Sequence, residues 1–369
     1  MDAGPFGAVG KMGRGMIVPT MGNCTLQINV AASDWRHLQH ILPHQLRQLR
    51  AQVDHVLVVA DLQAPSGRYA RSAGRSDSEE VVALLEQIRA ADSRCVIRAV
   101  DTTVEMRTTL ARRFLGGVMP PLRDGHGGPY HAYLQGLLQA PTDAILHLDA
   151  DMLLGGGSMT WVAEAMAALN DQPGVLMCAP LPGPPAPHGV LPPQAIAAHA
   201  RAQRYGSMPR RIDGQIAYRF RHASTRAFLI RRDRLEATEL AIVKMRSGVA
   251  DRHARRMAAP LEVALSALMR RDGLERLDML GEMPGMWTLH PHARTPAFYQ
   301  GLSKLIYRVE HGLVPDDQRG HFDLRRSFLD WGADPPPFDS RPRWRRNLSL
   351  ALRRTPLRAA LERRAQRFG

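Results

Sequence analysis

Two aspartates separated by one residue follow an apolar run in the segment AILHLDADMLLGG, Ala144 to Gly156. The run Ala144 to Leu148 is typical of a strand that is buried on both faces. Carboxylates at the end of such a strand are costly to remove from water unless a cation meets them. Mg²⁺ and Mn²⁺ accept one or two carboxylates together with phosphate oxygens and water. The spacing therefore favours a metal site at Asp149 and Asp151, with a solvated turn as the alternative.

Strand and helix patterns alternate ahead of this segment. Runs of β-branched and other apolar residues indicate strands, and apolar positions with a period near 3.6 residues indicate helices. The predicted strands are Thr25 to Ala32, Val53 to Ala60, Cys95 to Val100 and Ala144 to Leu148, and the predicted helices are Trp35 to Gln52, Ser78 to Ala91 and Pro129 to Gln139. This order predicts an α/β fold, a mostly parallel sheet flanked by helices.

The first two helices carry start and break signals. Asp34 precedes the first helix and Asp77 the second, each as a predicted N-cap. Pro43 lies inside the first helix, where we expect a kink or a break.

Four acids follow the predicted strands: Asp61, Asp101, Asp149 and Asp151. In parallel sheets, ligands bind beyond the carboxyl ends of the strands. A single acid after a strand is usually a turn residue or a helix cap, and this alternative stands for Asp101. The convergence of all four on one edge nevertheless predicts a ligand site there.

The second half of the chain mixes regular elements with a long irregular segment. We expect helices at Ser158 to Leu169 and Pro260 to Arg270, and strands at Gly174 to Ala179 and Ala227 to Ile230. Residues 180–221 contain PLPGPPAPHGVLPP and are interpreted as a lid loop with a short helix. Its arginines and aromatic residues could clamp a diphosphate and a sugar, or only form a solvated surface.

Length and composition fit one large globular domain with appendages. The chain has 369 residues, of which 44% are hydrophobic and 23% charged. Three distant cysteines without a C-x-x-C pattern indicate reduced core residues and a cytoplasmic protein. We expect a disordered leader at residues 1–22, a first half at 23–155 that carries the acids after the strands, and a second half at 156–334.

The basic charge is concentrated in a tail. The formal net charge is +14, but residues 341–369 alone hold ten arginines and one acid. Residues 335–369 are therefore predicted to form a helical, basic, amphipathic extension that could lie on an anionic membrane surface. The alternative is a disordered or self-packed terminal helix.

The stretches NVAASDWRHLQHILPHQLRQLRAQVDHVLVVAD, HAYLQGLLQAPTDAILHLDADM, AFLIRRDRL and LEVALSALMRRDGL lie between Asn29 and Leu274. In these stretches the chain resembles family-2-type glycosyltransferases of the GT-A fold. The resemblance implies a nucleotide-diphosphate sugar donor, a Mn²⁺ or Mg²⁺ cofactor and inversion at the anomeric carbon. It also implies that residues 23–155 form the nucleotide-sugar-binding half and residues 156–334 the acceptor-binding half, for a saccharide, lipid-linked or small-molecule acceptor.

The resemblance also assigns roles to the acids. Asp61 is implied to hold the nucleotide base or ribose, Asp149 to lie near the ribose and sugar, and Asp151 to ligate the metal. Glu262 falls where the family carries a Glu-Asp pair whose aspartate is the general base. This departure leaves a helix N-terminal acid as the alternative role for Glu262, and Asp233 as a spare base.

Further positions are less specific. The family's Arg-Asn ahead of the fourth strand is replaced by Tyr133 and Leu134. Gly127 and Gly128 could let the backbone approach a diphosphate, or could form a simple loop. In WTLHPH, His290 is a candidate metal or phosphate ligand and His292 would point the same way.

Three rival functions remain open. A sugar-1-phosphate nucleotidyltransferase would require a Gly-rich, basic loop after the first strand, where this chain has AASDWRH. A non-enzymatic protein could bind nucleic acid or membrane through the arginine tail. A catalytically inactive donor-binding homologue would explain the incomplete Glu-Asp pair.

Overall fold

The computed structural model describes residues 23–63, 78–186, 210–211, 216–245, 257–291 and 294–329. The predicted leader at 1–22, the basic tail at 335–369, Asp77, His292 and most of the lid loop at 180–221 lie outside these ranges. No helix within the described ranges is both long and apolar enough to cross a membrane.

A large mixed sheet forms the centre of the molecule, with the strand order β3-β2-β1-β4-β9-β6-β10-β8-β7. One half is parallel and consists of β1 (Cys24–Ala31), β2 (His55–Asp61), β3 (Cys95–Ala99) and β4 (Ala144–Asp149). Leu26, Leu146 and Leu148 are fully buried, because helices cover both faces of these strands.

The other half of the sheet mixes parallel and antiparallel pairs. β9 (Ala227–Arg231) lies antiparallel between β4 and β6 (Val175–Pro182), and β10 (Glu275–Met279) pairs with β6 in parallel. β8 (Ala217–Phe220) and β7 (Arg210–Arg211) form the antiparallel edge. β11 (Trp287–Leu289) pairs with β5 (Leu153–Gly155) and β6. The predicted α/β class with a mostly parallel sheet is confirmed.

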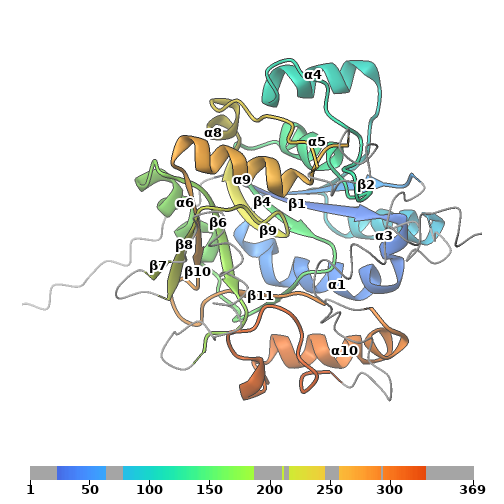
Figure 1. Cartoon of the computed structure of the whole chain (residues 1–369). Helices are drawn as coiled ribbons and strands as arrows, with labels where there is room; N and C mark the ends of the chain where they lie inside the picture. The colour runs from blue at the N-terminus through green and yellow to red at the C-terminus, as the bar shows by residue number, and fades with distance from the viewer. Residues whose placement is uncertain are drawn as a thin grey trace, which may run out of the picture.

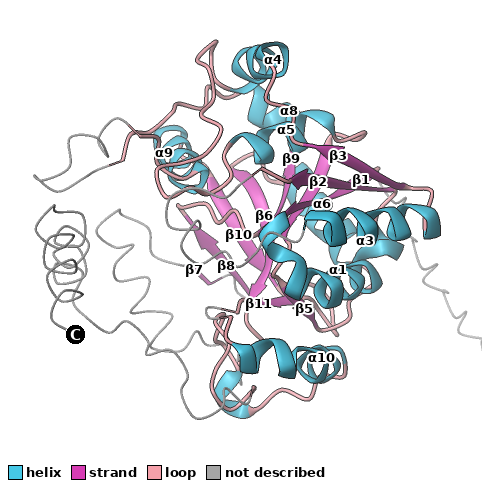
Figure 2. Cartoon of the chain, turned by 90° about the vertical axis from the view of Figure 1, so that its right-hand side faces the viewer, coloured by secondary structure: helices cyan, strands magenta, loops and turns pink. Residues whose placement is uncertain are grey.

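Helices cover the two faces of the sheet as separate layers (Figures 1 and 2). α1 (Trp35–Leu49), α3 (Ser78–Ala91) and α6 (Trp161–Asp171) bury their apolar sides in one core. α4 (Val104–Phe114), α5 (His131–Gln139), α8 (Arg232–Glu236) and α9 (Leu261–Asp272) pack in a second core on the opposite face. α10 (Pro296–Glu310) packs beside α1, below the sheet in both views.

Asp34 is the residue before α1, as predicted, but the helix is not broken at Pro43 and ends before Gln52. α1 continues through Pro43 as one helix and ends at Leu49, before a short 3-10 turn that ends at Gln52. Asp34 does not cap α1 with its side chain, because it closes the 3-10 turn Ala32–Asp34 and accepts a 2.8 Å hydrogen bond from the Ala31 amide. All three cysteines are buried and unpaired, as predicted.

Candidate active site

Asp149 is fixed at the end of β4 by contacts from three elements. Its amide donates to the Arg226 carbonyl at 2.8 Å, and its carbonyl accepts from Gln45 Nε2 of α1 at 2.9 Å. The Tyr133 hydroxyl of α5 donates to Asp149 Oδ1 at 2.6 Å, and His147 Nε2 lies 3.3 Å from the same oxygen. Asp149 Oδ2 takes part in none of these contacts. The contacts at Oδ1 therefore fix the orientation of the carboxylate and leave Oδ2 for another partner.

Asp151 follows in the turn after β4 and is only 6% exposed. The Arg294 guanidinium contacts Oδ2, whereas Oδ1 is buried and has no hydrogen-bond partner within the described ranges. Burial raises the pKa of the Asp151 carboxyl, but the positive charges of Arg294, His290 and Arg226 outweigh burial and lower it to about 2. Asp151 is therefore an ionised carboxylate with one unused oxygen.

His290 approaches the same carboxylate from the segment after β11. Its Nε2 lies 3.8 Å from Asp151 Oδ2, and its Nδ1 lies 2.8 Å from Asp323 Oδ1. Metal-ligating histidines commonly use the second ring nitrogen in this way, to hold the ring against a carboxylate.

The donors fit a divalent cation that is only partly held by protein. Asp151 Oδ1 is an unsatisfied buried oxygen, and His290 Nε2 points toward the same carboxylate. Among the residues that the structure describes, no group of three or more His, Cys, Asp and Glu side chains forms a complete metal site. Mg²⁺ and Mn²⁺ suit such a sparse set, because phosphate oxygens and water supply their remaining ligands.

Asp34, at the end of the turn between β1 and α1, and His37, in the first turn of α1, complete this corner of the site. Burial raises the pKa of Asp34 to about 6, although Arg294 lowers it, and the charges of Asp151 and Asp149 add to the increase. Burial and the charge of Arg294 lower the pKa of His37 to about 3. His37 Nε2 lies 3.5 Å from Asp34 Oδ1, and neither ring nitrogen of His37 makes a hydrogen bond with the described residues.

Glu262 lies in the first turn of α9, on the opposite face of the sheet from α1. Burial raises the pKa of its carboxyl, while Arg276 and Arg226 lower it and the charge of Asp149 raises it further. The structure thus brings Glu262 within electrostatic reach of Asp149, with the positive charge of Arg226 acting on both Glu262 and Asp151.

Asp61 and Asp101 lie at the carboxyl ends of the neighbouring strands, as predicted. Asp61 ends β2 and forms a 2.7 Å ion pair with Arg123. Asp101 follows β3, and its Oδ1 accepts a 2.9 Å hydrogen bond from the Thr103 amide, just before α4. The Asp101 carboxylate therefore has a turn-forming role, and donor binding by either acid stays a prediction.

Gly127 and Gly128 lie in a turn that closes on Asp124. The Gly127 amide donates to the Asp124 carbonyl at 2.9 Å, and the Gly128 amide donates to Asp124 Oδ1 at 3.0 Å. Gly127 has φ 87°, a left-handed conformation that favours glycine. Both amides already have acceptors within this turn. An approach of these glycines to a diphosphate stays a prediction.

Sequence reasoning did not identify the arginines of the site. Arg226 precedes β9 and Arg294 precedes α10, and neither belongs to a recognisable motif. The sequence does carry one pattern next to Arg294, because Thr295-Pro296 is typical of a helix start. In the structure Thr295 Oγ1 accepts a 3.2 Å hydrogen bond from the Phe298 amide. That signal predicts α10 and would have placed Arg294 at its beginning.

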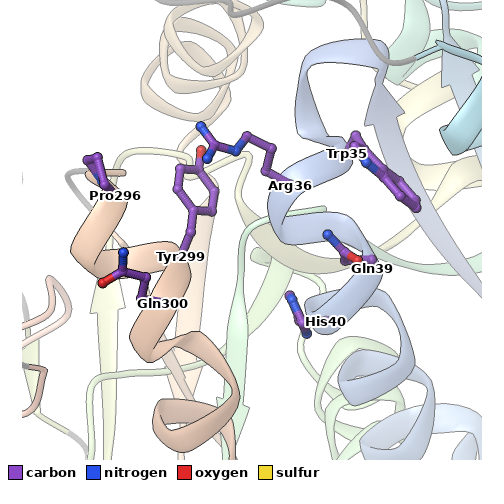
Figure 3. A pocket seen from close by; sticks show the side chains of 7 residues that line it. All are labelled: Trp35, Arg36, Gln39, His40, Pro296, Tyr299 and Gln300. Carbon is purple, nitrogen blue, oxygen red and sulfur yellow. The ribbon is translucent and has the colours of Figure 1, made fainter.

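A shallow cavity of about 460 Å³ lies between α1 and α10, close to the start of both helices (Figure 3). Its lining residues are Trp35, Arg36, Gln39, His40, Pro296, Tyr299 and Gln300. The Arg36 guanidinium lies over the Tyr299 ring, 4.5 Å from its centre. Tyr299 also interacts electrostatically with Arg294, which places this cavity next to the Asp151 corner.

Comparisons with known proteins gave matches among solved structures only. No protein-family model matches the chain, and no curated protein matches its sequence. The structure of UDP-glucose pyrophosphorylase complexed with UDP-glucose is 10% identical, with a TM-score of 0.40, and the match covers 78% of this chain and 99% of that one.

Two glycosyltransferase structures also match. Glucosyl-3-phosphoglycerate synthase from Mycobacterium tuberculosis, in complex with Mn²⁺, UDP and glucosyl-3-phosphoglycerate, is 12% identical with a TM-score of 0.35, covering 80% of this chain and 81% of that one. The galactosyltransferase LgtC, in complex with donor and acceptor sugar analogues, is 12% identical with a TM-score of 0.30, covering 58% and 59%.

The matched structures belong to the class of nucleotide-diphospho-sugar enzymes that the sequence resemblance names. All identities are below 25% and all three TM-scores are below 0.5.

Proposed function

We propose that this chain is a glycosyltransferase that moves a sugar from a nucleotide-diphosphate sugar to an acceptor hydroxyl, with Mn²⁺ or Mg²⁺ and with inversion. The observation that carries the proposal is the pair Asp149 and Asp151 at the end of β4: the charge of Asp149 acts on Glu262, and His290 Nε2 lies 3.8 Å from Asp151 Oδ2. A donor diphosphate bound at this edge would have a metal site on one side and a base on the other.

The donor would be held along the carboxyl edge of the parallel strands. Asp151 and His290, with Asp149 beside them, would hold the cation, which neutralises charge on the departing diphosphate. Asp61 is proposed to bind the base or ribose and Asp149 the ribose and sugar. Asp101, Gly127 and Gly128 are proposed to line the same edge.

The chemical step would be a single in-line displacement. Glu262 takes the proton of the acceptor hydroxyl, the hydroxyl oxygen forms a bond to the anomeric carbon, and the bond from that carbon to the diphosphate oxygen breaks. A pKa raised by burial suits this role, because a base works best when its pKa is near the operating pH. Attack opposite the leaving group inverts the anomeric centre.

A nucleotidyltransferase is the rival within the same class. Such an enzyme would need a glycine-rich, basic loop after β1 to hold a triphosphate. Here the chain instead forms a short 3-10 turn at Ala32–Asp34, in which the Asp34 carboxylate accepts a hydrogen bond from the Ala31 amide. A negative charge in this loop disfavours triphosphate binding, so the transferase is the stronger proposal.

The domain scheme belongs to the same proposal. Residues 23–155 would bind the donor and residues 156–334 the acceptor, with residues 180–221 as a lid. The basic segment 335–369 is proposed to attach the enzyme to an anionic membrane surface from the cytoplasmic side.

Thermal unfolding with nucleotides tests the proposal. UDP, GDP, CMP and dTDP would each be added with Mn²⁺ or with a chelator to the wild-type chain, to Asp151→Asn and to Asp316→Asn, a control at a fully exposed acid. A ligand that binds only the folded state at 100 times its Kd adds about 2.7 kcal/mol of stability. We expect one nucleotide to raise the Tm only with Mn²⁺, in the wild type and the control but not in Asp151→Asn. No shift with any nucleotide would overturn the proposal.

A further inference from the structure

Arg294 holds Asp151 by a single contact and is bordered by a second carboxylate. Its guanidinium touches only Oδ2 of Asp151, and its charge also acts on Asp34. The side chain is 36% exposed, so the described residues do not enclose it. The residue lies immediately before Thr295, the N-cap of α10.

A buried structural ion pair elsewhere in the chain looks different. Arg276 Nε and Nη2 donate to Asp278 Oδ1 and Oδ2 at 2.6 and 2.8 Å, and the two side chains are 6% and 3% exposed. That pair satisfies both carboxylate oxygens. The Asp151 pair leaves Oδ1 buried without a hydrogen bond to any described residue. The contrast indicates that the Asp151 carboxylate is built for a further positive partner.

We propose that Arg294 exchanges partners when the donor binds: it holds Asp151 in the ligand-free protein and transfers to the diphosphate when a divalent cation occupies Asp151. The inference rests on the proposed function. A cation at Asp151 repels the guanidinium, because both positive charges would share one carboxylate. A diphosphate that enters with the cation offers Arg294 a second anion, and the planar guanidinium matches phosphate oxygens well.

α10, which begins two residues after Arg294, is tied to α1. α10 is anchored at its far end, where Glu310 Oε1 lies 2.7 Å from His44 Nδ1 and 2.8 Å from Arg47 Nη2 of α1. The exchange proposed for Arg294 is a rotation about its side-chain bonds that leaves α10 in place.

The exchange predicts opposite effects of one substitution on two ligands. In Arg294→Gln the competitor for Asp151 is gone, so Mn²⁺ alone should bind about tenfold tighter, and the diphosphate contact is also gone, so UDP with Mn²⁺ should bind about tenfold weaker. Arg36→Gln is the matched control, because it removes a positive charge from the same edge where Arg36 stacks on Tyr299. Both affinities should stay within about threefold of wild type in the control.

Calorimetric titration and Mn²⁺ electron paramagnetic resonance on the full chain would measure both affinities, with UDP replaced by GDP, CMP or dTDP if one of these gives the thermal shift. Arg294→Lys keeps a positive charge, so its affinities for Mn²⁺ alone and for UDP with Mn²⁺ should both lie between those of wild type and Arg294→Gln. Misfolding of the Gln variant would not produce this graded order. If wild type binds Mn²⁺ with a nucleotide but Arg294→Gln weakens both ligands or neither, the exchange is wrong. If wild type binds no nucleotide, the proposed function itself fails.

Discussion

The hydroxyl of Tyr133 donates a 2.6 Å hydrogen bond to Asp149 Oδ1 and so ties α5 to the carboxyl end of β4. Tyr133 is buried, and burial together with the negative charge of Asp149 raises its pKa, which keeps the phenol protonated as the donor. Asp149, the first acid of the Asp-x-Asp pair, is therefore oriented by a neutral hydrogen-bond donor.

Removing this hydroxyl should loosen Asp149. In Tyr133→Phe we expect nucleotide affinity to fall about tenfold, since a hydrogen bond to a charged group contributes about 1.5–3 kcal/mol. Tyr130→Phe is the control, because the Tyr130 hydroxyl is buried without a hydrogen-bond partner in the described structure. Calorimetry should show unchanged binding in the control. Equal losses in both variants would mean that packing of the rings, not the hydrogen bond, supports the site.

The sequence pattern predicts the parallel half of the fold well for a physical reason. β1, β2 and β4 are short runs buried on both faces, and Asp61 and Asp149 end β2 and β4 at the sheet edge. The edge acids Asp61, Asp101 and Asp149 follow from this register. Short strands such as β5 and β11 were not predicted, because three residues carry too little periodicity to distinguish a strand from a loop.

The cationic half of the site depends on tertiary contacts that no local pattern encodes. Arg294 reaches Asp151 across 143 positions of sequence, and Arg226 reaches Glu262 from a loop before β9. Asp34 has the residue type and the position of an N-cap, but its carboxylate turns to the Ala31 amide instead. These residues could be recognised only after α1, α10 and the sheet had been assembled.

Glu262 should affect turnover and not donor binding. In Glu262→Gln we expect kcat to fall by at least about a hundredfold while nucleotide affinity stays unchanged, since a general base contributes typically 10²–10⁴-fold. Because burial raises the pKa of Glu262, the acid limb of the wild-type rate profile should lie above pH 4.5, the ordinary value of the group. Activity should therefore be lost as the pH falls through this limb.

Glu105→Gln is the control for the alternative role of Glu262 as a helix N-terminal acid. Glu105 also lies in the first turn of a helix, α4, and is exposed. It should change neither turnover nor the pH profile. Normal turnover of Glu262→Gln would remove Glu262 as the base and turn attention to another acid.

The Arg123–Asp61 ion pair separates a binding role from a structural one. Asp61→Asn and Arg123→Gln both break the 2.7 Å pair and should each lower the free energy of unfolding by about 1–3 kcal/mol. Only Asp61→Asn should also weaken nucleotide binding if Asp61 contacts the base or ribose. Urea unfolding and calorimetry on both variants give the comparison, and nucleotide binding that survives in Asp61→Asn would leave the pair with a structural role alone.

Asp34 and His37 should give the metal-free protein opposing pH dependences. The pKa of His37 is about 3 in the fold against an ordinary 6.5, so its contribution to stability is complete above pH 6.5 and is lost as the pH falls. The pKa of Asp34 is about 6 against 3.8, so its contribution is complete below pH 3.8 and is lost as the pH rises through 6. From pH 7 to pH 5, His37 should remove about 2 kcal/mol and Asp34 should add about 1.4 kcal/mol, at 1.36 kcal/mol per pKa unit.

Substitution of either residue should expose the contribution of the other. Relative to wild type over the same interval, His37→Gln should become more stable on acidification and Asp34→Asn less stable, as measured by urea unfolding with a chelator present. The two residues lie next to Arg294, which lowers the pKa of both. Arg294→Gln should therefore raise both pKa values. The pH dependence of stability that comes from Asp34 should then increase, and the pH dependence that comes from His37 should decrease. If the free energy of unfolding of His37→Gln and of Asp34→Asn instead changes in the same direction between pH 7 and pH 5, the opposing ionisation of these two groups does not set the pH dependence.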